Sequence, residues 1–405
     1  MNVQKITFQN KTGEILTGRM ELPAGQKPHQ YAIFAHCFTC TKNLTAVVNI
    51  SRTLAQAGFG VLRFDFTGLG ESEGDFADTN FSGNVEDLVE AARFLEENYE
   101  APTLLVGHSL GGSAVIFAAA QLDSVRAVTT IGAPSDPAHV QRLLKDSREE
   151  IIKNGKATVN LEGRDFTIKK QFLDDLESQN LAEIIHRFEK SLLIMHSPQD
   201  QTVEIMNAEK LYKAARHPKS FITLDGADHL LSKKADSRYV GQVIAGWASR
   251  YLEIPEKEEL LSHKNVAASL DSQEGFTTKM KLGKHSSLAD EPVSFGGKDF
   301  GPDPYAYVAG GLAACKVMTV QMYAKRKKWD LQNATVHINH SREHRVDAVH
   351  AENESSAKID TFSCEISFTG DLSEAQKERL LEISDRCPVH RTLTRDIQII
   401  SQLIE

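Results

Sequence analysis

Residues 103–120 restrict the fold of this chain more than any other stretch. A run of apolar residues leads into Gly107-His108-Ser109-Leu110-Gly111, and small and apolar residues follow to position 120. This order predicts a buried strand, a sharp turn and then a helix. Glycines flank Ser109 because a turn that lifts one hydroxyl above a sheet crowds its neighbours. We therefore predict that Ser109 is a nucleophile and that the Leu110 amide, at the start of the helix, donates to an oxyanion.

The length and charge of the chain narrow the class of protein further. At 405 residues the chain is too long for one ordinary core, so we expect two domains. Its formal net charge of -9 and its pI near 5.9 argue against a protein that binds nucleic acid. Residues 1–9 lack the apolar core of a signal peptide, and no segment is long and apolar enough to span a bilayer. We therefore expect a cytoplasmic protein that does not associate with membranes.

The five cysteines stand at positions 37, 40, 315, 364 and 387. They are too few and too unevenly placed for a disulfide framework, and a reducing compartment favours free or catalytic thiols. Cys37 and Cys40 form a C-x-x-C pair, which is compatible with redox or metal chemistry. No second pair accompanies it, so a role within a loop is favoured over either chemistry.

Strand and helix patterns alternate through the first 250 residues. Alternating apolar residues at 3–9 and 14–22 predict two antiparallel strands at one edge of a sheet. Further strands are predicted at 31–36, 60–66, 125–131, 192–196 and 220–224, and helices at 44–57, 85–97 and 237–251. Because strand, helix and strand alternate, the sequence predicts an open, mostly parallel α/β sheet with functional groups at the carboxyl ends of its strands.

Two residues downstream of the serine are suited to activate it. Asp200 follows a predicted strand, and His229 lies in the loop after the last one. A serine hydroxyl becomes an effective nucleophile when a neutral imidazole accepts its proton and a carboxylate fixes the tautomer of that imidazole. We predict His229 as the base and Asp200 as the orienting acid, because the order Ser, Asp, His suits this kind of sheet. Two alternatives stay open: Asp200 as the N-cap of a helix at 201–212, and Asp225 or Asp228 as the acid.

Five short motifs are distributed over the first 253 residues. They are His36-Cys37-Phe38-Thr39, Asp65-Phe66-Thr67-Gly68-Leu69-Gly70-Glu71-Ser72, Gly107-His108-Ser109-Leu110-Gly111, Ser197-Pro198-Gln199-Asp200 and Asp225-Gly226-Ala227-Asp228-His229. Together they make residues 1–253 resemble an α/β hydrolase. In that family the loop after the third strand usually reads His-Gly-Phe, so the resemblance implies that the Phe38 amide is the second oxyanion donor. Cys37 stands here in place of the glycine.

Between positions 135 and 190 the alternation of strands and helices stops. A hairpin is predicted at 157–168, with helices at 140–153 and 172–188 on either side of it. In α/β hydrolases an insertion at this place forms a cap over the nucleophile and shapes the acyl pocket. A small cap with a hairpin is similar to those of esterases that act on short acyl or hydroxycinnamoyl esters.

A charged, proline-interrupted stretch at 254–264 predicts a linker, and a new pattern begins at 265. Strands are predicted at 266–270, 276–282, 334–339, 345–351 and 359–368, and helices at 304–328 and 373–385. Asp303 is the predicted N-cap of the longer helix, and Pro304 lies in its first turn. The helix interior at 308–315 is nearly all small or apolar, so we expect this helix to be buried on most sides.

Several motifs characterise residues 265–405. They are Ala289-Asp290-Glu291-Pro292, Gly296-Gly297, Gly301-Pro302-Asp303-Pro304, Ala313-Ala314-Cys315 and Cys387-Pro388. They resemble the OsmC-like family, which includes organic hydroperoxide resistance proteins. The resemblance implies an α+β fold, an intertwined homodimer, and two cysteines that reduce peroxides by forming a disulfide, with Cys315 as the attacking thiol and Cys387 as the resolving one. Tyr305 stands where the family's peroxidases carry a glutamate, so a structural role for Cys315 stays open.

The sequence as a whole predicts a serine esterase joined to an OsmC-like module. The hydrolase half is expected to cleave a small-molecule ester through an acyl-enzyme, without a metal or a cofactor. The OsmC-like half is expected either to reduce an organic hydroperoxide with electrons from a thiol reductant, or to act as a scaffold for dimerisation or ligand binding. Acyl transfer or peptide cleavage by the hydrolase half is a further alternative.

Overall fold

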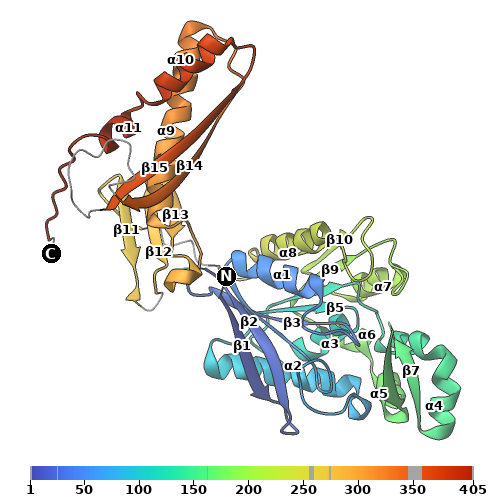
Figure 1. Ribbon diagram of the computed structural model, residues 1–405. Coiled ribbons are helices and arrows are strands. Elements are labelled where there is room, and N and C mark those ends of the chain that lie inside the picture. Colours follow the sequence, from blue (N-terminus) through green and yellow to red (C-terminus); the bar gives the residue numbers. More distant parts are fainter. Residues whose placement is uncertain are drawn as a thin grey trace. The chain divides into compact units, whose positions relative to one another are not determined.

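The computed structural model describes residues 2–24, 26–161, 163–254, 260–272, 275–344 and 358–403. The chain divides into two compact units, Met1–Glu258 and Glu259–Glu405, each with its own secondary structure (Figure 1). The linker predicted at 254–264 includes residues 255–259, which lie outside the described residues. No helix within the described ranges combines the length and the apolar character needed to cross a membrane.

The first unit is built around one eight-stranded sheet. From edge to edge its strands are β1 (Asn2–Gln9), β2 (Ile15–Leu22), β4 (Phe59–Phe64), β3 (Gln30–Ala35), β5 (Leu104–His108), β6 (Ala127–Ile131), β9 (Ser191–His196) and β10 (Lys219–Thr223). From β4 to β10 neighbouring strands run parallel. In contrast, β1 and β2 form an antiparallel hairpin, and β2 is antiparallel to β4. The predicted mostly parallel sheet with a hairpin at its edge is therefore confirmed.

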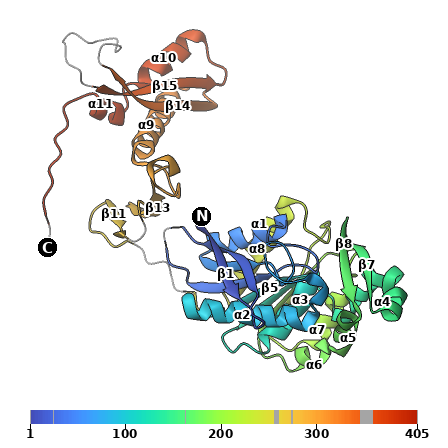
Figure 2. The ribbon, with the colours of Figure 1, turned by 60° about the horizontal axis from the view of Figure 1, so that its bottom comes forward.

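Helices cover both faces of this sheet (Figure 2). They are α1 (Thr45–Gln56), α2 (Phe81–Asn98), α3 (Leu110–Ala119), α7 (Met206–Ala214) and α8 (Lys234–Ala248), with a short 3-10 helix, η1 (Phe76–Asp78). Side chains of β3 alternate between two apolar cores. Ala32 and Phe34 belong to the core that includes α1 and α8, whereas Ile33 and Ala35 belong to the core that includes α2 and α3. Because both faces are buried, this strand carries no charged residue and is mostly apolar from Tyr31 to Ala35.

Short elements lie between β6 and β9, where the sequence predicts a cap at 135–190, and this segment keeps the name cap below. They are η2 (Pro137–Ser147), α4 (Arg148–Asn154), β7 (Lys156–Leu161), β8 (Arg164–Lys169), α5 (Lys170–Ser178) and α6 (Leu181–His186). The two strands form the expected antiparallel hairpin. The helix predicted at 140–153 begins instead as a 3-10 helix. The helix predicted at 172–188 is interrupted, because the Asn180 side chain accepts the Glu183 N–H at 3.1 Å and starts a new helix.

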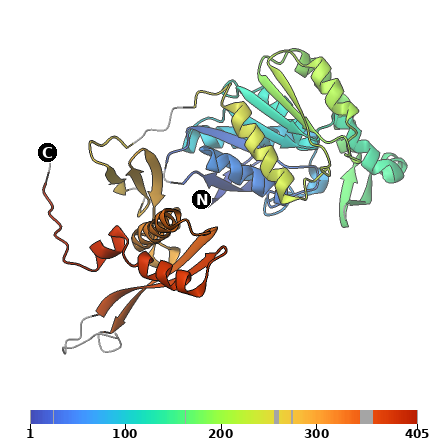
Figure 3. The same ribbon diagram turned by 90° about the horizontal axis from the view of Figure 1, so that it is seen from above.

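The second unit has an α+β architecture. Its elements are β11 (Val266–Leu270), β12 (Thr278–Leu282), β13 (His285–Ala289), η4 (Val293–Phe295), α9 (Pro304–Lys327), β14 (Asn333–His344), β15 (Lys358–Thr369), α10 (Glu374–Ser384) and α11 (Pro388–Leu393). The first three strands form one antiparallel sheet, and β14 pairs with β15 (Figure 3). The strand predicted at 345–351 lies outside the described residues.

The long helix α9 begins as predicted but is less buried than predicted. Asp303 accepts the Ala306 N–H at 2.8 Å, and Pro304 is the first helical residue. The buried side chains recur every four residues and so lie on one face, and they are Leu312, Lys316, Val320 and Ala324. Met318 and Met322 are 63% and 73% exposed. Burial on most sides is therefore wrong for a single chain, because only one face of the helix packs against β14 and α10.

Candidate active site

Ser109 stands on a sharp turn between β5 and α3. Its backbone has a positive φ of 55° with ψ of -126°, which is strained for a residue with a side chain. The glycines on either side are required because backbones approach closely. A Cβ on Gly107 would lie 2.3 Å from the Gly111 carbonyl oxygen, and a Cβ on Gly111 would lie 2.4 Å from the His36 carbonyl oxygen. The turn thus presents the Ser109 hydroxyl at the carboxyl edge of the sheet.

The loops that follow β9 and β10 bring two side chains to this turn. Because β5, β9 and β10 belong to the parallel part of the sheet, their carboxyl ends lie at the same edge. His229 Nε2 lies 3.0 Å from Ser109 Oγ, and His229 Nδ1 lies 2.7 Å from Asp200 Oδ2. Both distances are those of hydrogen bonds. The three residues that the sequence assigns to nucleophile, base and orienting acid are therefore adjacent in the fold.

Asp200 contacts the histidine with one carboxylate oxygen and the backbone with the other. Its Oδ1 accepts the N–H groups of Thr202 and Val203, each at 2.9 Å. Burial alone would raise the pKa of Asp200, but the hydrogen bonds from His229 and from these amides hold it below its ordinary value. The N-cap alternative is wrong, because the helix begins only at Met206 and Asp200 closes a turn. An Asp200 anion is thus available to fix the His229 tautomer.

Three further histidines surround the site, and all are buried. His108 Nε2 lies 2.7 Å from the His229 carbonyl oxygen, and burial lowers the pKa of His108 to about 3. Burial also lowers the pKa of His36 and of His196, whose Nε2 lies 2.7 Å from the Val203 carbonyl oxygen. The three rings are therefore neutral and bring no charge to the site. No group of three or more His, Cys, Asp or Glu side chains in the described ranges is arranged to hold a metal ion.

The loop after β3, residues 36–42, carries the second predicted oxyanion donor and is termed here the oxyanion loop. In the described part of the chain, no hydrogen bond uses the N–H of Phe38 or of Leu110. Both residues are buried, and the Phe38 ring stacks on Phe172 of the cap with centroids 4.9 Å apart. A disulfide joins Cys37 to Cys40 around Phe38. The expectation of free thiols is therefore wrong for this pair, whose bond closes the turn that holds the Phe38 amide.

A buried ion pair fixes the far end of the oxyanion loop, and sequence reasoning missed it. Lys42 and Asp65 are both fully buried, and the Lys42 ammonium pairs with the Asp65 carboxylate. Asp65 Oδ1 also accepts the Lys42 N–H at 2.7 Å, and Arg63 donates to the Lys42 carbonyl oxygen at 2.7 Å. From the cap, the Arg164 guanidinium donates to the Thr39 carbonyl oxygen. The loop is thus held from the sheet and from the cap.

The two predicted redox cysteines of the second unit lie together. Cys315 and Cys387 stand 72 positions apart in the sequence, yet the Cys315 thiol lies close enough to add to the effect of burial on the pKa of the Cys387 thiol. Cys387 is buried, and its sulfur accepts the His390 N–H at 3.3 Å. Burial raises the pKa of the Cys387 thiol, and the nearby charge of Lys316 lowers it only in part. Lys316 itself is buried and pairs with Asp385 at 2.5 Å.

Tyr305, which replaces the glutamate of the family's peroxidases, belongs to a separate polar group. Its hydroxyl accepts a hydrogen bond from Arg342 at 2.9 Å, and its ring stacks on His340 with centroids 4.0 Å apart. Arg342 also donates to Asp360 at 3.0 Å. The Arg342 guanidinium is therefore directed to a phenol and a carboxylate, and no hydrogen bond in the described residues joins it to either cysteine.

An open, mostly parallel sheet with a serine on a strand-to-helix turn and a Ser–His–Asp chain at its carboxyl edge defines an α/β hydrolase. Residues 26–182 match the family model of serine aminopeptidase, S33, and residues 296–402 match that of OsmC-like protein. The chain therefore belongs to the esterase-like α/β hydrolases of the S33 family in its first part and carries an OsmC-like domain in its second.

Known proteins resemble the first unit in particular. The esterase domain of a Rhodothermus marinus protein is 52% identical, covers 62% of this chain and 99% of that one, and superposes with a TM-score of 0.53. Est1E from Butyrivibrio proteoclasticus, solved with ferulic acid, shares the fold at 19% identity and a TM-score of 0.52, over 61% of this chain and 98% of that one. The mouse mitochondrial palmitoyl-protein thioesterase ABHD10 is 26% identical over 50% of this chain and 70% of its own.

Proposed function

We propose that the hydrolase unit is a serine carboxylesterase that acts through an acyl-enzyme. The observation that carries this proposal is the continuous hydrogen-bonded chain from Ser109 through His229 to Asp200. Ser109 Oγ attacks the ester carbonyl while His229 accepts its proton, and Asp200 stabilises the imidazolium. The amides of Phe38 and Leu110 bind the oxyanion. His229 then protonates the leaving alkoxide, and water releases the acid by the same steps.

The acyl group is proposed to be a small or hydroxycinnamoyl chain. Four phenylalanines connect the oxyanion loop with the cap, with neighbouring ring centroids between 4.9 and 5.5 Å apart, and they are Phe38, Phe76, Phe166 and Phe172. Their rings limit the space for the acyl chain and offer an aromatic surface. The esterase domain and the ferulate-bound enzyme among the similar structures favour the same class. The similarity to a palmitoyl-protein thioesterase and to the serine aminopeptidase family makes cleavage of thioesters or of peptides the alternatives.

A substrate panel separates these activities. Purified protein is assayed with p-nitrophenyl esters of two to sixteen carbons, methyl ferulate, palmitoyl-thioester and aminopeptidase substrates, beside a Ser109→Ala variant. The proposal expects the highest kcat/KM for short-chain and hydroxycinnamoyl esters, with loss of all of it in Ser109→Ala. A preference for long thioesters or for peptides would replace the proposed substrate class, and turnover that survives in the variant would remove Ser109 from the mechanism.

We further propose that the OsmC-like unit reduces organic hydroperoxides with the thiols Cys315 and Cys387. The Cys315 thiolate attacks the O–O bond, which gives a sulfenic acid and an alcohol. Cys387 then attacks that sulfur, water leaves, and the resulting disulfide is reduced by an external thiol. The closeness of the two thiols, through which Cys315 adds to the raised pKa of Cys387, supports this function.

A scaffold without turnover is the competing function for this unit, and Tyr305 in place of the glutamate favours it. The two functions are separated by measuring how fast the protein consumes cumene hydroperoxide in the presence of a dithiol reductant. The redox proposal expects loss of consumption in Cys315→Ser and accumulation of sulfenic acid in Cys387→Ser. Equal hydroperoxide consumption by wild type and Cys315→Ser would reject the redox proposal, and the scaffold function would remain. In either case the unit is proposed to form a homodimer through the exposed face of α9.

A further inference from the structure

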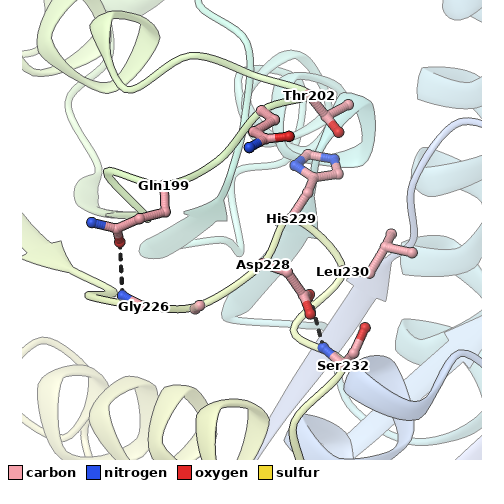
Figure 4. Close-up of a pocket in the computed structure, with 9 residues that line it drawn as sticks. Gln199, Thr202, Gly226, Asp228, His229, Leu230 and Ser232 are labelled. Atoms are coloured by element: carbon pink, nitrogen blue, oxygen red, sulfur yellow. Dashed lines mark hydrogen bonds between the residues drawn. The ribbon is translucent and has the colours of Figure 1, made fainter.

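A pocket of about 480 Å³ opens beside His229, between the loops that follow β9 and β10 (Figure 4). Its lining residues are Gln199, Gln201, Thr202, Gly226, Ala227, Asp228, His229, Leu230 and Ser232. His229 is the residue that the pocket shares with the candidate triad. No lining residue comes from the cap or from the oxyanion loop, so this pocket is distinct from the aromatic cluster proposed to face the acyl chain.

The chemistry at His229 decides which part of an ester this pocket receives. In acylation the Ser109 oxygen bonds to the carbonyl carbon, the bond from that carbon to the alcohol oxygen breaks, and the proton on His229 Nε2 passes to the leaving oxygen. The leaving oxygen must therefore lie next to His229, whereas the carbonyl oxygen lies between the amides of Phe38 and Leu110. The alcohol is thereby directed towards the loops that carry His229, and the acyl chain towards the cap.

Polar atoms in the pocket are available to a ligand. Gln199 uses its Oε1 to accept the Gly226 N–H at 2.7 Å, and Asp228 uses its Oδ1 to accept the Ser232 N–H at 2.9 Å (Figure 4). Within the described residues, Gln199 Nε2, Asp228 Oδ2, the Gln201 amide and the Thr202 hydroxyl make no hydrogen bond. Gln199 Nε2 can donate to a ligand hydroxyl, Asp228 Oδ2 can accept from one, and the Gln201 side-chain amide and the Thr202 hydroxyl can do both.

The charge of the pocket favours one class of alcohol over another. No lysine or arginine lines it, and Asp228 contributes a carboxylate. A phosphate-bearing alcohol would be repelled by that carboxylate, and the Lys233 ammonium beside the pocket already donates to the Gly226 carbonyl oxygen, at 3.5 Å. A neutral polyol, in contrast, can donate hydroxyl protons to Asp228 and accept from the two glutamine amides. The polar lining therefore selects an alcohol with several hydroxyl groups.

We propose that this pocket is the leaving-group subsite of the hydrolase and that it binds the polyol alcohol of a glyceryl or glycosyl ester. The proposal rests on the proposed serine-esterase function and adds the class of alcohol to it. Gln201 and Thr202 are then specificity-determining residues. Both are exposed, and neither side chain makes a hydrogen bond within the described residues, so their replacement removes contacts to a ligand without breaking contacts of the fold.

Two esters with the same acyl group test the subsite, namely methyl butyrate and glyceryl monobutyrate. The double variant Gln201→Ala/Thr202→Val is expected to lower the ratio of kcat/KM for the glyceryl ester over the methyl ester by about tenfold, since each lost hydrogen bond costs roughly threefold or more. Both esters give the same butyryl-enzyme. The change should therefore appear in acylation, followed by release of the alcohol in stopped flow, and not in hydrolysis of the shared butyryl-enzyme.

Gln242→Ala, an exposed glutamine on α8, is the matched control and should keep the wild-type ratio. An unchanged ratio in the double variant, or an equal loss for both esters, overturns the subsite while the esterase function stands. If the wild-type protein hydrolyses neither ester and Ser109 takes up no fluorophosphonate, the proposed function itself fails, and the subsite fails with it.

Discussion

The two units of this chain bury apolar side chains to very different extents. In the first unit, apolar cores fill both faces of the sheet, and the candidate triad sits on loops that this sheet positions. In the second unit the buried cluster is small, and its members are Val320, Ala324, Leu331, Leu372 and Leu380. Large apolar side chains of that unit stay exposed, among them Phe295 (74%) and Met322 (73%).

The difference in buried core between the two units indicates which of them needs a partner chain. The first unit completes both its core and its candidate site from its own residues, so its activity should not depend on protein concentration. The second unit leaves one face of α9 apolar and exposed, which is typical of an interaction surface. A second copy of the chain is the proposed occupant, and a symmetric pair would cover the same face on both copies.

The largest expected effect is confined to the first unit. Asp200→Asn should lower kcat for ester hydrolysis by about 10⁴, because an amide does not hold His229 in the tautomer that accepts the serine proton. Steady-state assays with a p-nitrophenyl ester measure this loss. The control is Asp225→Asn, which changes one of the two exposed rival acids. Equal losses in the two variants would contradict the assignment of Asp200.

The next effect concerns the second unit. Met318→Lys together with Met322→Lys should raise the dissociation constant of the proposed homodimer at least about a thousandfold. The reason is that each buried methionine contributes roughly 1.5–3 kcal/mol and occurs twice in a symmetric interface. Light scattering over a concentration series follows the change. Met206→Lys changes a methionine of the first unit that is 52% exposed, and it is the control. A wild-type protein that is monomeric at every concentration would refute the interface.

A third change tests the buried ion pair of the oxyanion loop. Lys42→Met should lower the free energy of unfolding of the first unit by about 3–5 kcal/mol, because it leaves the Asp65 carboxylate buried without a paired cation. Urea titration in a Trp329→Phe background reports on this unit, since Trp247 is then the only tryptophan. Lys213→Met, which removes an exposed pair with Glu209 in the same unit, should leave stability nearly unchanged. A similar small effect in both variants would contradict the proposed stabilisation of the oxyanion loop by the pair of Lys42 and Asp65.

The smallest expected effect is a pH dependence of stability. Burial raises the pKa of Asp87 to about 6. The folded unit therefore binds more protons than the unfolded chain between pH 4 and 6, and this residue's contribution to stability falls as the pH rises through that window, by up to about 3 kcal/mol. Asp87→Asn should remove this component. The difference in the free energy of unfolding between wild type and variant should therefore change between pH 4 and 6 and stay constant above pH 6. A constant difference at every pH would contradict the shift.

The sequence predicts the hydrolase site well because its determinants are local. The glycines around Ser109 are demanded by the turn itself, and the order of Ser109, Asp200 and His229 follows from the order of the strands. The pair of Lys42 and Asp65 has no such signature, because 23 positions separate the residues and an isolated lysine usually lies at the surface. The helix break at Asn180 could have been found from its N-capping side chain.

Two errors have a different cause, because the missing information is not a sequence pattern. The C-x-x-C motif marks Cys37 and Cys40 as neighbours, but spacing alone does not tell whether they are joined. The small and apolar residues of α9 correctly indicate a helix that is suited to burial. A single chain provides the partner for only one face of it, so the prediction of burial on most sides fails until a second surface is present.

Labelling with a fluorophosphonate probe tests the central claim most directly. The full-length protein is incubated with the probe, and the modified peptide is identified by mass spectrometry. The account predicts one adduct on Ser109, fast labelling in wild type, slow labelling in His229→Ala and none in Ser109→Ala. An adduct on another residue, or labelling that persists in Ser109→Ala, would contradict it.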